Sequence, residues 1–341
     1  MRELGLRKWQ SLSLAAAFFI VLICILLFHS SDFVRSGNRR RILLKPPASL
    51  SEREKWDQVL RKATMPDRTV ILTMLDEAWA SPGSIIDVFL RSFKVGEGTE
   101  RFLNHLVIIP MDSKALNYCR SLHPYCFYPS IFSHNLRFIA QSRNPNHNVF
   151  IWKRNYVLLQ VLELGYNIIF TDADVMWLRS PLLQFHPQNE LTISCDFSSY
   201  KRRGGDVQGG GLFFLKSTAI SIEFFKYFNF MKVLYPNSRV NKSLCSYIVQ
   251  SEDVVAAYGF RVQYVNTTYF GEFCHLDKYQ FREVYSMHAN CCEDLRSKVY
   301  DLKLALHDWA RFRAHSSDNY TSKPTPFRWR APNKCLASRH E

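Results

Sequence analysis

Short apolar runs alternate with longer amphipathic stretches between residues 69 and 311. Short runs of this kind predict buried strands, and stretches with helical spacing predict helices that cover them. The predicted strands are 69–75, 105–110, 167–170, 191–195, 212–215 and 261–265. The predicted helices are about 82–93, 150–164 and 294–311. The alternation predicts an α/β fold, a mixed and mostly parallel sheet with flanking helices.

An uncharged apolar run precedes this body. Residues 12–28 read LSLAAAFFIVLICILLF, and about 17 to 20 apolar residues cross the hydrocarbon core of a bilayer as a helix. The run is longer than a usual signal-peptide core and no small-x-small cleavage site follows Phe28. We therefore expect an uncut transmembrane signal anchor, with a cleaved signal peptide as the alternative. The expected organisation is a cytosolic tail at 1–11, the anchor at 12–28, a stem at 29–68, a catalytic domain at 69–315 and a tail at 316–341.

The positive charge is concentrated near this run. The chain has a formal net charge of +14, and residues 1–45 hold eight Lys or Arg against two acidic residues. Cationic side chains beside an apolar segment meet lipid head groups. A nucleic-acid-binding protein would show a basic stripe and a known module, and neither is found. The charge therefore favours a membrane contact through 12–28 and no nucleic-acid partner.

Three acceptor motifs for N-glycosylation indicate the side of the membrane. Asn241, Asn266 and Asn319 each begin an N-x-[ST] motif, and all lie C-terminal to the anchor. Together they favour a lumenal body and type II topology. The eight cysteines outside the anchor are an even number, which an oxidising lumen permits to pair. Cys119 and Cys126 are spaced to close a small loop, and no cysteine spacing resembles a zinc site.

The densest chemical signal is Asp172 and Asp174, set between two apolar runs. Burying unpaired carboxylates there would be strongly destabilising, so a positive partner is expected. Side chains two apart on extended backbone point to one side, so both can face one cation. Carboxylate oxygens suit Mn²⁺ or Mg²⁺. The alternative is that the two aspartates cap a turn, with backbone amides or Arg179 as partners.

Two further groups are candidates for the same site. His288 is the candidate third metal ligand, because a neutral imidazole can complete an octahedral shell; alone, a histidine is more often structural. Gly209, Gly210 and Gly211 precede an apolar run. Glycines let backbone approach a ligand closely, and equally form a tight turn or bulge.

Several motifs together resemble plant members of glycosyltransferase family 77, nucleotide-diphospho-sugar transferases of GT-A fold. The resemblance covers roughly residues 69 to 313. The motifs that carry it are Trp79-Ala-Ser-Pro-Gly-Ser, His105-Leu-Val-Ile, Glu163-Leu-Gly-Tyr-Asn-Ile-Ile-Phe-Thr-Asp-Ala-Asp-Val-Met-Trp-Leu-Arg-Ser-Pro, Ser194-Cys-Asp, Tyr269-Phe-Gly-Glu-Phe-Cys and Met287-His-Ala-Asn-Cys-Cys.

The resemblance implies a type II Golgi membrane protein with a lumenal catalytic domain. It implies a Mn²⁺- or Mg²⁺-dependent enzyme that takes a nucleotide-sugar donor, UDP-linked or related, with retention of the anomeric configuration. Known activities in the family transfer xylose, arabinose or galactose to cell-wall polysaccharide or to glycoprotein. The expected metal ligands are Asp172, Asp174 and His288, and the expected donor-binding residues are Asp172, Gly210 and Gly211. The expected catalytic residues are Asp172, Asp174 and Asp196.

The chain departs from the family pattern at two places. Gly209-Gly-Gly-Leu stands where family members usually have Asn-Gly-Gly-Phe, and residues 241–245 lack the usual Asp-Gln pair. These departures keep open a non-catalytic lumenal carbohydrate-binding or scaffold protein of the same fold, and after it a metal-dependent phosphohydrolase. A covalent mechanism would need a carboxylate nucleophile, for which Asp196, Asp206 and Asp253 are available.

Overall fold

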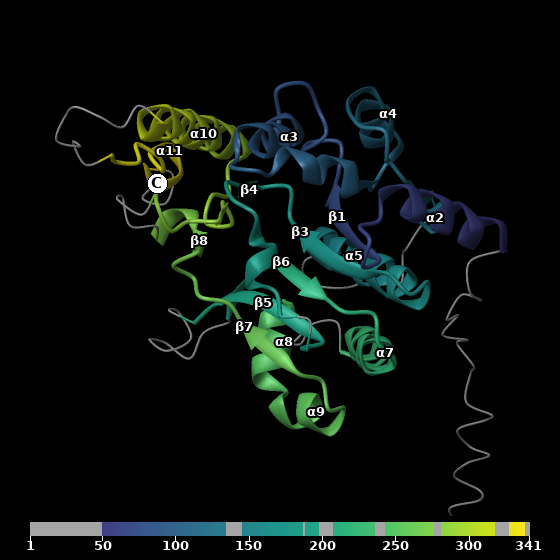
Figure 1. Ribbon diagram of the computed structural model, residues 1–341. Coiled ribbons are helices and arrows are strands. Elements are labelled where there is room, and N and C mark those ends of the chain that lie inside the picture. Colours follow the sequence, from purple (N-terminus) through teal and green to yellow (C-terminus); the bar gives the residue numbers. More distant parts are fainter. Residues whose placement is uncertain are drawn as a thin grey trace, which may run out of the picture. The chain divides into compact units, whose positions relative to one another are not determined.

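A computed structural model describes residues 50–133, 145–186, 188–197, 207–235, 243–275, 281–317 and 327–337. Its main sheet has six strands in the order β2-β1-β3-β6-β5-β7 (Figure 1). The strands are β1 (Thr69–Leu75), β2 (Leu106–Pro110), β3 (Asn167–Thr171), β5 (Leu191–Asp196), β6 (Gln208–Leu215) and β7 (Val262–Tyr264). The β1–β2, β1–β3 and β5–β7 pairs are parallel, and β6 runs antiparallel to both β3 and β5. The predicted mixed, mostly parallel sheet is confirmed.

A second sheet of three short strands was not predicted. It has the order β4-β9-β8, from β4 (Val175–Trp177), β8 (Phe270–Glu272) and β9 (Ser286–His288). Three residues are too few to show a strand period in sequence. This small sheet matters because β4 and β9 join segments more than a hundred residues apart.

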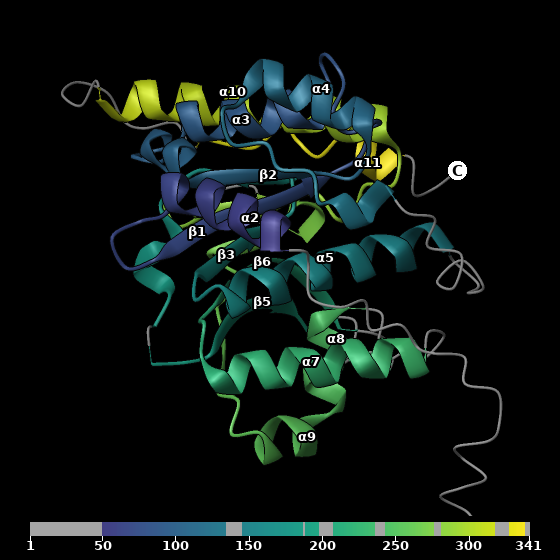
Figure 2. The same ribbon diagram turned by 90° about the vertical axis from the view of Figure 1, so that its right-hand side faces the viewer.

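Helices cover both faces of the main sheet. The helices of the described residues are α2 (Leu50–Ala63), α3 (Ile85–Val95), α4 (Ser113–Leu122), α5 (Pro145–Glu163), α7 (Ala219–Leu234), α8 (Leu244–Gln250), α9 (Glu252–Ala257), α10 (Leu295–Ser317) and α11 (Lys334–Ala337). Short 3-10 helices lie at Glu100–His105, Ser130–Ser133, Pro181–Gln184 and Phe273–His275. Figure 2 shows α3, α4 and α10 on one side of the sheet and α5 and α7 on the other.

The strand period divides the core in two. In β1, Ile71 and Leu75 pack in one apolar cluster with α3 and α10, whereas Val70 and Leu72 pack in a second cluster with α2, α5 and α7. Successive side chains of a strand point to opposite faces, so a continuous apolar run is required when both faces are covered. The sheet is therefore a buried layer whose strand ends carry the polar chemistry.

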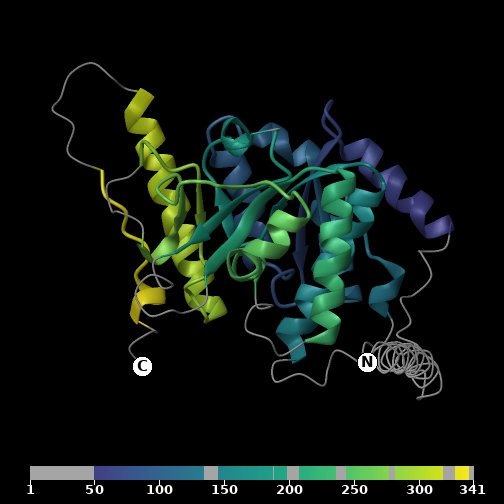
Figure 3. The ribbon, with the colours of Figure 1, turned by 90° about the horizontal axis from the view of Figure 1, so that it is seen from below.

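The folded body extends beyond both expected boundaries. Trp56 of α2, placed in the stem by sequence, is fully buried, and its ring lies 4.0 Å from that of Phe127, centroid to centroid. One compact unit spans Glu52 to Glu341, so the body begins before Thr69. At the other end, α10 continues to Ser317, and the segment 327–337 runs beside it (Figure 3). Part of the expected C-terminal tail thus belongs to the body, because its apolar side chains are buried there.

Residues 12–28, the expected anchor, lie outside the described residues. Among the residues that the structure describes, no helix is both long enough and apolar enough to cross a membrane. The anchor and the topology that depends on it remain predictions.

The described cysteines form four disulfides: Cys119–Cys126, Cys195–Cys245, Cys274–Cys291 and Cys292–Cys335. The predicted Cys119–Cys126 loop is confirmed. All eight cysteines outside the anchor are paired, as an even number in an oxidising compartment permits.

Candidate active site

The two aspartates lie in the turn that joins the two sheets. β3 ends at Thr171, β4 begins at Val175, and the Val175 amide donates to the Asp172 carbonyl at 3.1 Å. β9 pairs antiparallel with β4, with Val175 opposite His288. The next amide, of Ala289, donates to the Asp174 carbonyl at 3.1 Å. This pairing brings the three predicted metal ligands together, with one ligand atom of each within 4.8 Å of the others.

The side chains converge around one buried oxygen. His288 Nε2 lies 3.3 Å from Asp174 Oδ1 and 3.6 Å from Asp172 Oδ2. Asp174 is 2 % exposed, and the charged neighbour of its Oδ1 is the His288 ring. Two carboxylates buried side by side need positive charge between them, so the cluster is suited to a cation. Two carboxylate oxygens and one imidazole nitrogen are ligands that Mn²⁺ or Mg²⁺ accepts. The residues present therefore fit a divalent metal.

Lys298 is a member of the site that the sequence did not reveal. Its Nζ donates to Asp174 Oδ2 at 2.7 Å and lies 4.9 Å from the centre of the Trp79 ring. The lysine stands in the first turn of α10, and Trp79 in the connection between β1 and α3. Lys298 therefore occupies one oxygen of Asp174 and leaves the other toward His288. Lys298 and Asp174 are separated by 124 residues, and no local pattern connects them.

Arg154 is a second buried cation near the site. It lies on α5, is 8 % exposed, and its guanidinium carbon is 5.4 Å from the centre of the Phe170 ring. Burial lowers the pKa of Arg154, and the charge of Asp172 opposes that shift. An arginine inside a helical pattern is usually a solvated side chain, so its place at the site could not be predicted. Arg154 adds positive potential on the Asp172 side of the pair.

Arg179, the partner suggested by the turn-cap alternative, points elsewhere. Its Nε donates to Glu97 Oε2 at 3.0 Å, and one terminal nitrogen donates to the carbonyls of Phe281 and Val284, each at 2.8 Å. The cations around the aspartates are instead Lys298, Arg154 and His288, which favours a binding site over a capped turn.

The surroundings shift the pKa values of the two carboxylates in opposite directions. Burial raises the pKa of Asp172 to about 6, where the charge of His288 opposes the rise and that of Asp174 adds to it. Burial also acts on Asp174, but the charges of His288 and Lys298 outweigh it and hold the pKa of Asp174 well below its usual range. Burial alone would lower the pKa of His288, yet Asp174 raises it above the ordinary value. Asp174 is thus ionised at any physiological pH, ready for a cation.

Gly211 has a role that differs from the predicted donor contact. A β-carbon at this position would lie 2.3 Å from His288 Cε1, so only glycine leaves room for the imidazole. Its carbonyl also accepts the Asp172 amide at 2.6 Å. Gly209 has φ +100°, and the β5–β6 register shifts between Ile193 and Cys195, so the bulge expected as an alternative is present as well. Gly210 lies in β6 between Gly209 and Gly211.

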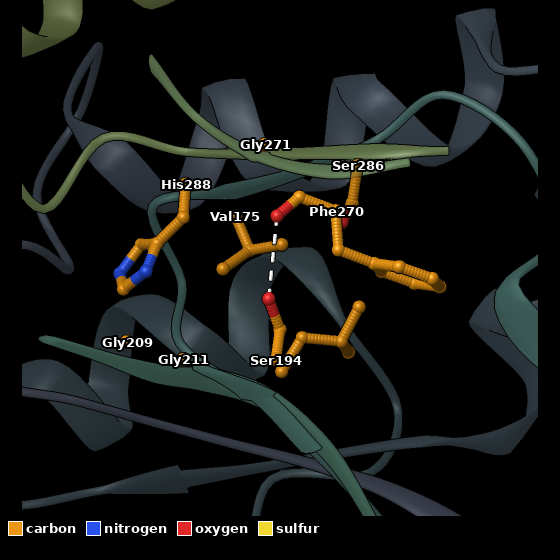
Figure 4. Close-up of a pocket in the computed structure, with 9 residues that line it drawn as sticks. Val175, Ser194, Gly209, Gly211, Phe270, Gly271, Ser286 and His288 are labelled. Atoms are coloured by element: carbon orange, nitrogen blue, oxygen red, sulfur yellow. Dashed lines mark hydrogen bonds between the residues drawn. The ribbon is translucent and has the colours of Figure 1, made fainter. Parts of the chain in front are cut away.

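A small pocket opens beside the imidazole (Figure 4). Strands β6, β8 and β9 supply most of its wall, and the hydrogen bond from Ser194 Oγ to the Phe270 carbonyl, 3.2 Å long, joins two of the lining residues. The residues that line it are Val175, Ser194, Gly209, Gly211, Leu212, Phe270, Gly271, Ser286 and His288. Glycines and small side chains leave this space open next to the metal ligands.

Three of the other predicted residues, Asp196, Asp253 and Asn266, lie among the described residues. Asp196 ends β5, opposite Gln208 of β6; its side chain is outside the description. Asp253 is exposed on α9. Asn266 is exposed in the turn before β8, where its Oδ1 accepts the Thr268 amide at 2.8 Å. Asp206, Asn241 and Asn319 lie outside the described residues.

Comparison with known proteins agrees with this site. The profile of the nucleotide-diphospho-sugar transferase family matches residues 101–302, a range that holds Asp172, Asp174, His288 and Lys298. The chain belongs to this family. Its predicted membership among plant glycosyltransferases, with a GT-A-like fold, is thereby supported, and the chain is a glycosyltransferase that uses a nucleotide-sugar donor.

The chain is similar to several proteins along its length. An uncharacterized protein of Arabidopsis thaliana is 30% identical over 289 residues, which are 83% of this chain and 74% of the relative. UDP-D-xylose:L-fucose alpha-1,3-D-xylosyltransferase 1 of Arabidopsis thaliana is 29% identical over 119 residues, 34% of this chain and 26% of that protein. A galactosyltransferase solved with donor and acceptor sugar analogs is 15% identical, covering 74% of this chain and 97% of that one with a TM-score of 0.36.

Proposed function

We propose that this glycosyltransferase moves xylose, arabinose or galactose from a UDP-sugar to a cell-wall polysaccharide or glycoprotein, with Mn²⁺ or Mg²⁺ and with retention of configuration. The observation that carries the proposal is the convergence of Asp172, Asp174 and His288, which come from two strand ends and offer ligand atoms within 4.8 Å of one another. A site that needs a cation, in a family that handles nucleotide sugars, is suited to binding a diphosphate through a metal.

Each residue then has a role. Asp174 would hold the ion with the oxygen that Lys298 does not occupy, since Lys298 donates to Oδ2. Asp172 would contact the ion or the donor ribose, and His288, from β9, would be the third ligand. When bound, the ion neutralises the charge that develops on the departing nucleoside diphosphate. Lys298 and Arg154 stabilise the carboxylates before the ion arrives.

The choice of a UDP donor follows the named relatives. The xylosyltransferase above takes UDP-D-xylose, and a second relative, from Dictyostelium discoideum, is a UDP-galactose:fucoside alpha-3-galactosyltransferase, 33% identical over 72 residues, 20% of this chain and 11% of that protein. A UDP donor is common to both names. A pentose or a hexose as the transferred group remains the open choice within the proposal.

Retention of the anomeric configuration requires one of two routes. Either the acceptor attacks on the face from which the nucleotide departs, or a carboxylate first forms a covalent intermediate with the sugar. Asp196 is the carboxylate that we propose for the second route. It follows Cys195, which pairs with Gly209 of the pocket wall. The acceptor hydroxyl attacks the anomeric carbon in either route, and its proton leaves with the nucleotide.

We place the enzyme in the Golgi membrane as a type II protein, anchored through 12–28. Four disulfides in the described body suit an oxidising lumen. Asn266, exposed in its turn, is the described glycosylation site that this topology predicts to be occupied.

The test is turnover of a panel of UDP-sugars by the full-length chain, followed by mass spectrometry, with Mn²⁺ or with a chelator. Consumption of one donor that needs metal and is lost in Asp174→Asn supports the proposal and identifies the sugar. Full turnover in Asp174→Asn would refute the metal assignment. Failure of the folded wild-type chain to bind UDP or any UDP-sugar would refute the donor assignment.

A further inference from the structure

The short connection between β9 and α10 carries two residues of the site at its ends. His288 closes β9, and Lys298 stands in the first turn of α10. Between them lie the adjacent Cys291 and Cys292, and each is bonded to a different part of the chain. Cys291 pairs with Cys274, just beyond β8, and Cys292 pairs with Cys335 near the end of the described chain. The connection is thus covalently held from two directions.

The segment that supplies Cys335 is itself fixed on α10. We call residues 327–337 the C-terminal strap; Figure 3 shows it running beside α10. Asp308 of α10 accepts the Arg330 amide at 2.8 Å and the Arg330 Nε at 2.7 Å. Asp301, three residues after Lys298, accepts the amides of Asn333 at 2.9 Å and Cys335 at 2.8 Å through one oxygen. Both aspartates are buried: Asp301 is 0 % exposed and Asp308 is 1 % exposed.

Those aspartates serve the strap and not their own helix. A buried carboxylate is expensive unless it is well paired, so two of them on one helix indicate a contact that must be kept. The bonds to Asn333 and Cys335 lie one helical turn from Lys298, on the same helix. The strap is therefore anchored where α10 meets the site.

An aromatic stack joins the strap to the other side of the small sheet. Trp329 lies on Phe281 with ring centroids 3.5 Å apart. The Phe281 carbonyl accepts from Arg179, which follows β4, and the Arg179 guanidinium lies 4.7 Å from the centre of the Trp309 ring of α10. The strap thus contacts the approach to β9 and the helix that bears Lys298, and it is linked to the exit of β4 through Phe281.

We propose that the C-terminal strap is a positioning element of the metal site, holding His288 and Lys298 in the arrangement that a divalent ion needs. The inference rests on the proposed metal site. Metal–ligand distances tolerate only about 0.2 Å, and residues behind the ligands typically change metal affinity by about 10- to 100-fold. A connection of a few residues, freed at Cys292, would let both side chains move by more than that.

The test compares two disulfide deletions in the full-length chain. Cys292→Ala with Cys335→Ala removes the strap bond, and Cys119→Ala with Cys126→Ala, a disulfide between α4 and the loop after it, is its control. The sequence separations are 43 and 7 residues, so the control releases less loop-closure entropy, and the arginine variants below supply the comparison that is matched in burial. Mn²⁺ binding is measured by titration calorimetry, and hydrogen exchange is followed in the peptide 286–298. We expect roughly tenfold or weaker Mn²⁺ binding and faster exchange in the strap variant, with Mn²⁺ affinity within about twofold of wild type in the control.

A second pair of variants tests the same proposal if the chain that lacks the Cys292–Cys335 disulfide does not fold. Arg330→Met loosens the strap with every disulfide intact. Arg261→Met is a close control, because Arg261 also donates its amide, at 2.9 Å, and its guanidinium, at 2.9 and 3.0 Å, to one buried acid, Glu190. The arginine side chains are 49% and 61% exposed, and their acids 1% and 3%. Weaker Mn²⁺ binding in Arg330→Met alone supports the positioning role.

The outcomes separate the two proposals. If the wild-type chain binds no Mn²⁺, the proposed metal site and this inference both fail. If the wild type binds Mn²⁺ and the strap variants bind it as their controls do, only the positioning role is overturned. Equal losses of affinity in strap and control variants also overturn it, because they would show a general effect of lower stability.

Discussion

Replacing Gly211 by alanine tests the site at its tightest contact. A β-carbon there would lie 2.3 Å from His288 Cε1, 2.6 Å from Nδ1 and 2.8 Å from Nε2, whereas ordinary contact begins at 3.4 Å. The imidazole must therefore retreat by about 1 Å. It can do so because the nearest atoms belong to the end of a side chain and not to backbone. We expect Gly211→Ala to fold with the ring displaced.

The consequence for metal binding follows from that displacement. Ligand distances in metal sites are defined to about 0.2 Å, so a shift of about 1 Å removes His288 as a ligand. The Mn²⁺ affinity should fall about 100-fold, which corresponds to about 2.7 kcal/mol. Turnover at a limiting Mn²⁺ concentration should fall by a similar factor.

The assay is titration calorimetry with Mn²⁺, beside thermal unfolding. Gly259→Ala is the control, because nothing lies within 4 Å of its β-carbon but its φ is +64°. It should lose about 1 kcal/mol of stability from the left-handed backbone and bind Mn²⁺ as the wild type does. If Gly211→Ala bound Mn²⁺ with unchanged affinity, His288 would not be a ligand in the arrangement described.

Four further predictions concern the same chain. Asp174→Asn should abolish detectable Mn²⁺ binding in calorimetry and leave Lys298 without its buried partner, which urea unfolding should report as a loss of about 3 kcal/mol. Asp172→Asn should stabilise the metal-free protein at pH 8 by up to about 3 kcal/mol, because burial raises the pKa of this carboxyl from 3.8 to about 6. The folded state then holds the Asp172 proton more tightly than the unfolded state, so the gain is complete above pH 6 and absent below about pH 4; urea midpoints at both pH values check it. For the same reason, wild-type Mn²⁺ affinity measured by calorimetry should weaken as the pH falls, first because a proton competes for His288, whose pKa is raised above its ordinary value, and then below about 6 because a proton competes for Asp172. Asn266→Gln, expressed in the secretory pathway, should lack one glycan and therefore migrate faster on gels than the wild type. Equal mobility of the two proteins would exclude Asn266 as an acceptor.

The main sheet could be predicted because its strands are buried on both faces. Runs such as 69–75 are apolar throughout, and that pattern is visible in sequence. The strands of the small sheet have three residues each, and their pairing depends on contacts across the chain. The helix that contains Trp56 is predicted to belong to the stem because its remaining residues are mostly polar. A single tryptophan in a polar segment does not indicate burial.

Only part of the site could be predicted from the sequence, because some of its residues meet only in the folded chain. Asp172 and Asp174 stand together at a strand end, and His288 lies in a motif of its own. Lys298 and Arg154 act at the site from two helices, where a basic residue usually faces solvent. Gly211 was singled out as glycine, but the ring that it accommodates comes from a strand far along the chain. Residue types were visible; the contacts between them required the fold.

The separation of 124 residues between Asp174 and Lys298 has a consequence for biosynthesis. When the ribosome has made β3 and β4, the two aspartates exist but His288, Lys298 and Cys335 do not. Domains of this size acquire their long-range contacts late, so the nascent chain holds its acidic turn with Arg154 but without the charges of His288 and Lys298 until β9 and α10 emerge. Ability to bind a divalent ion would then mark a finished molecule, and a chain released before its last cysteine would lack it.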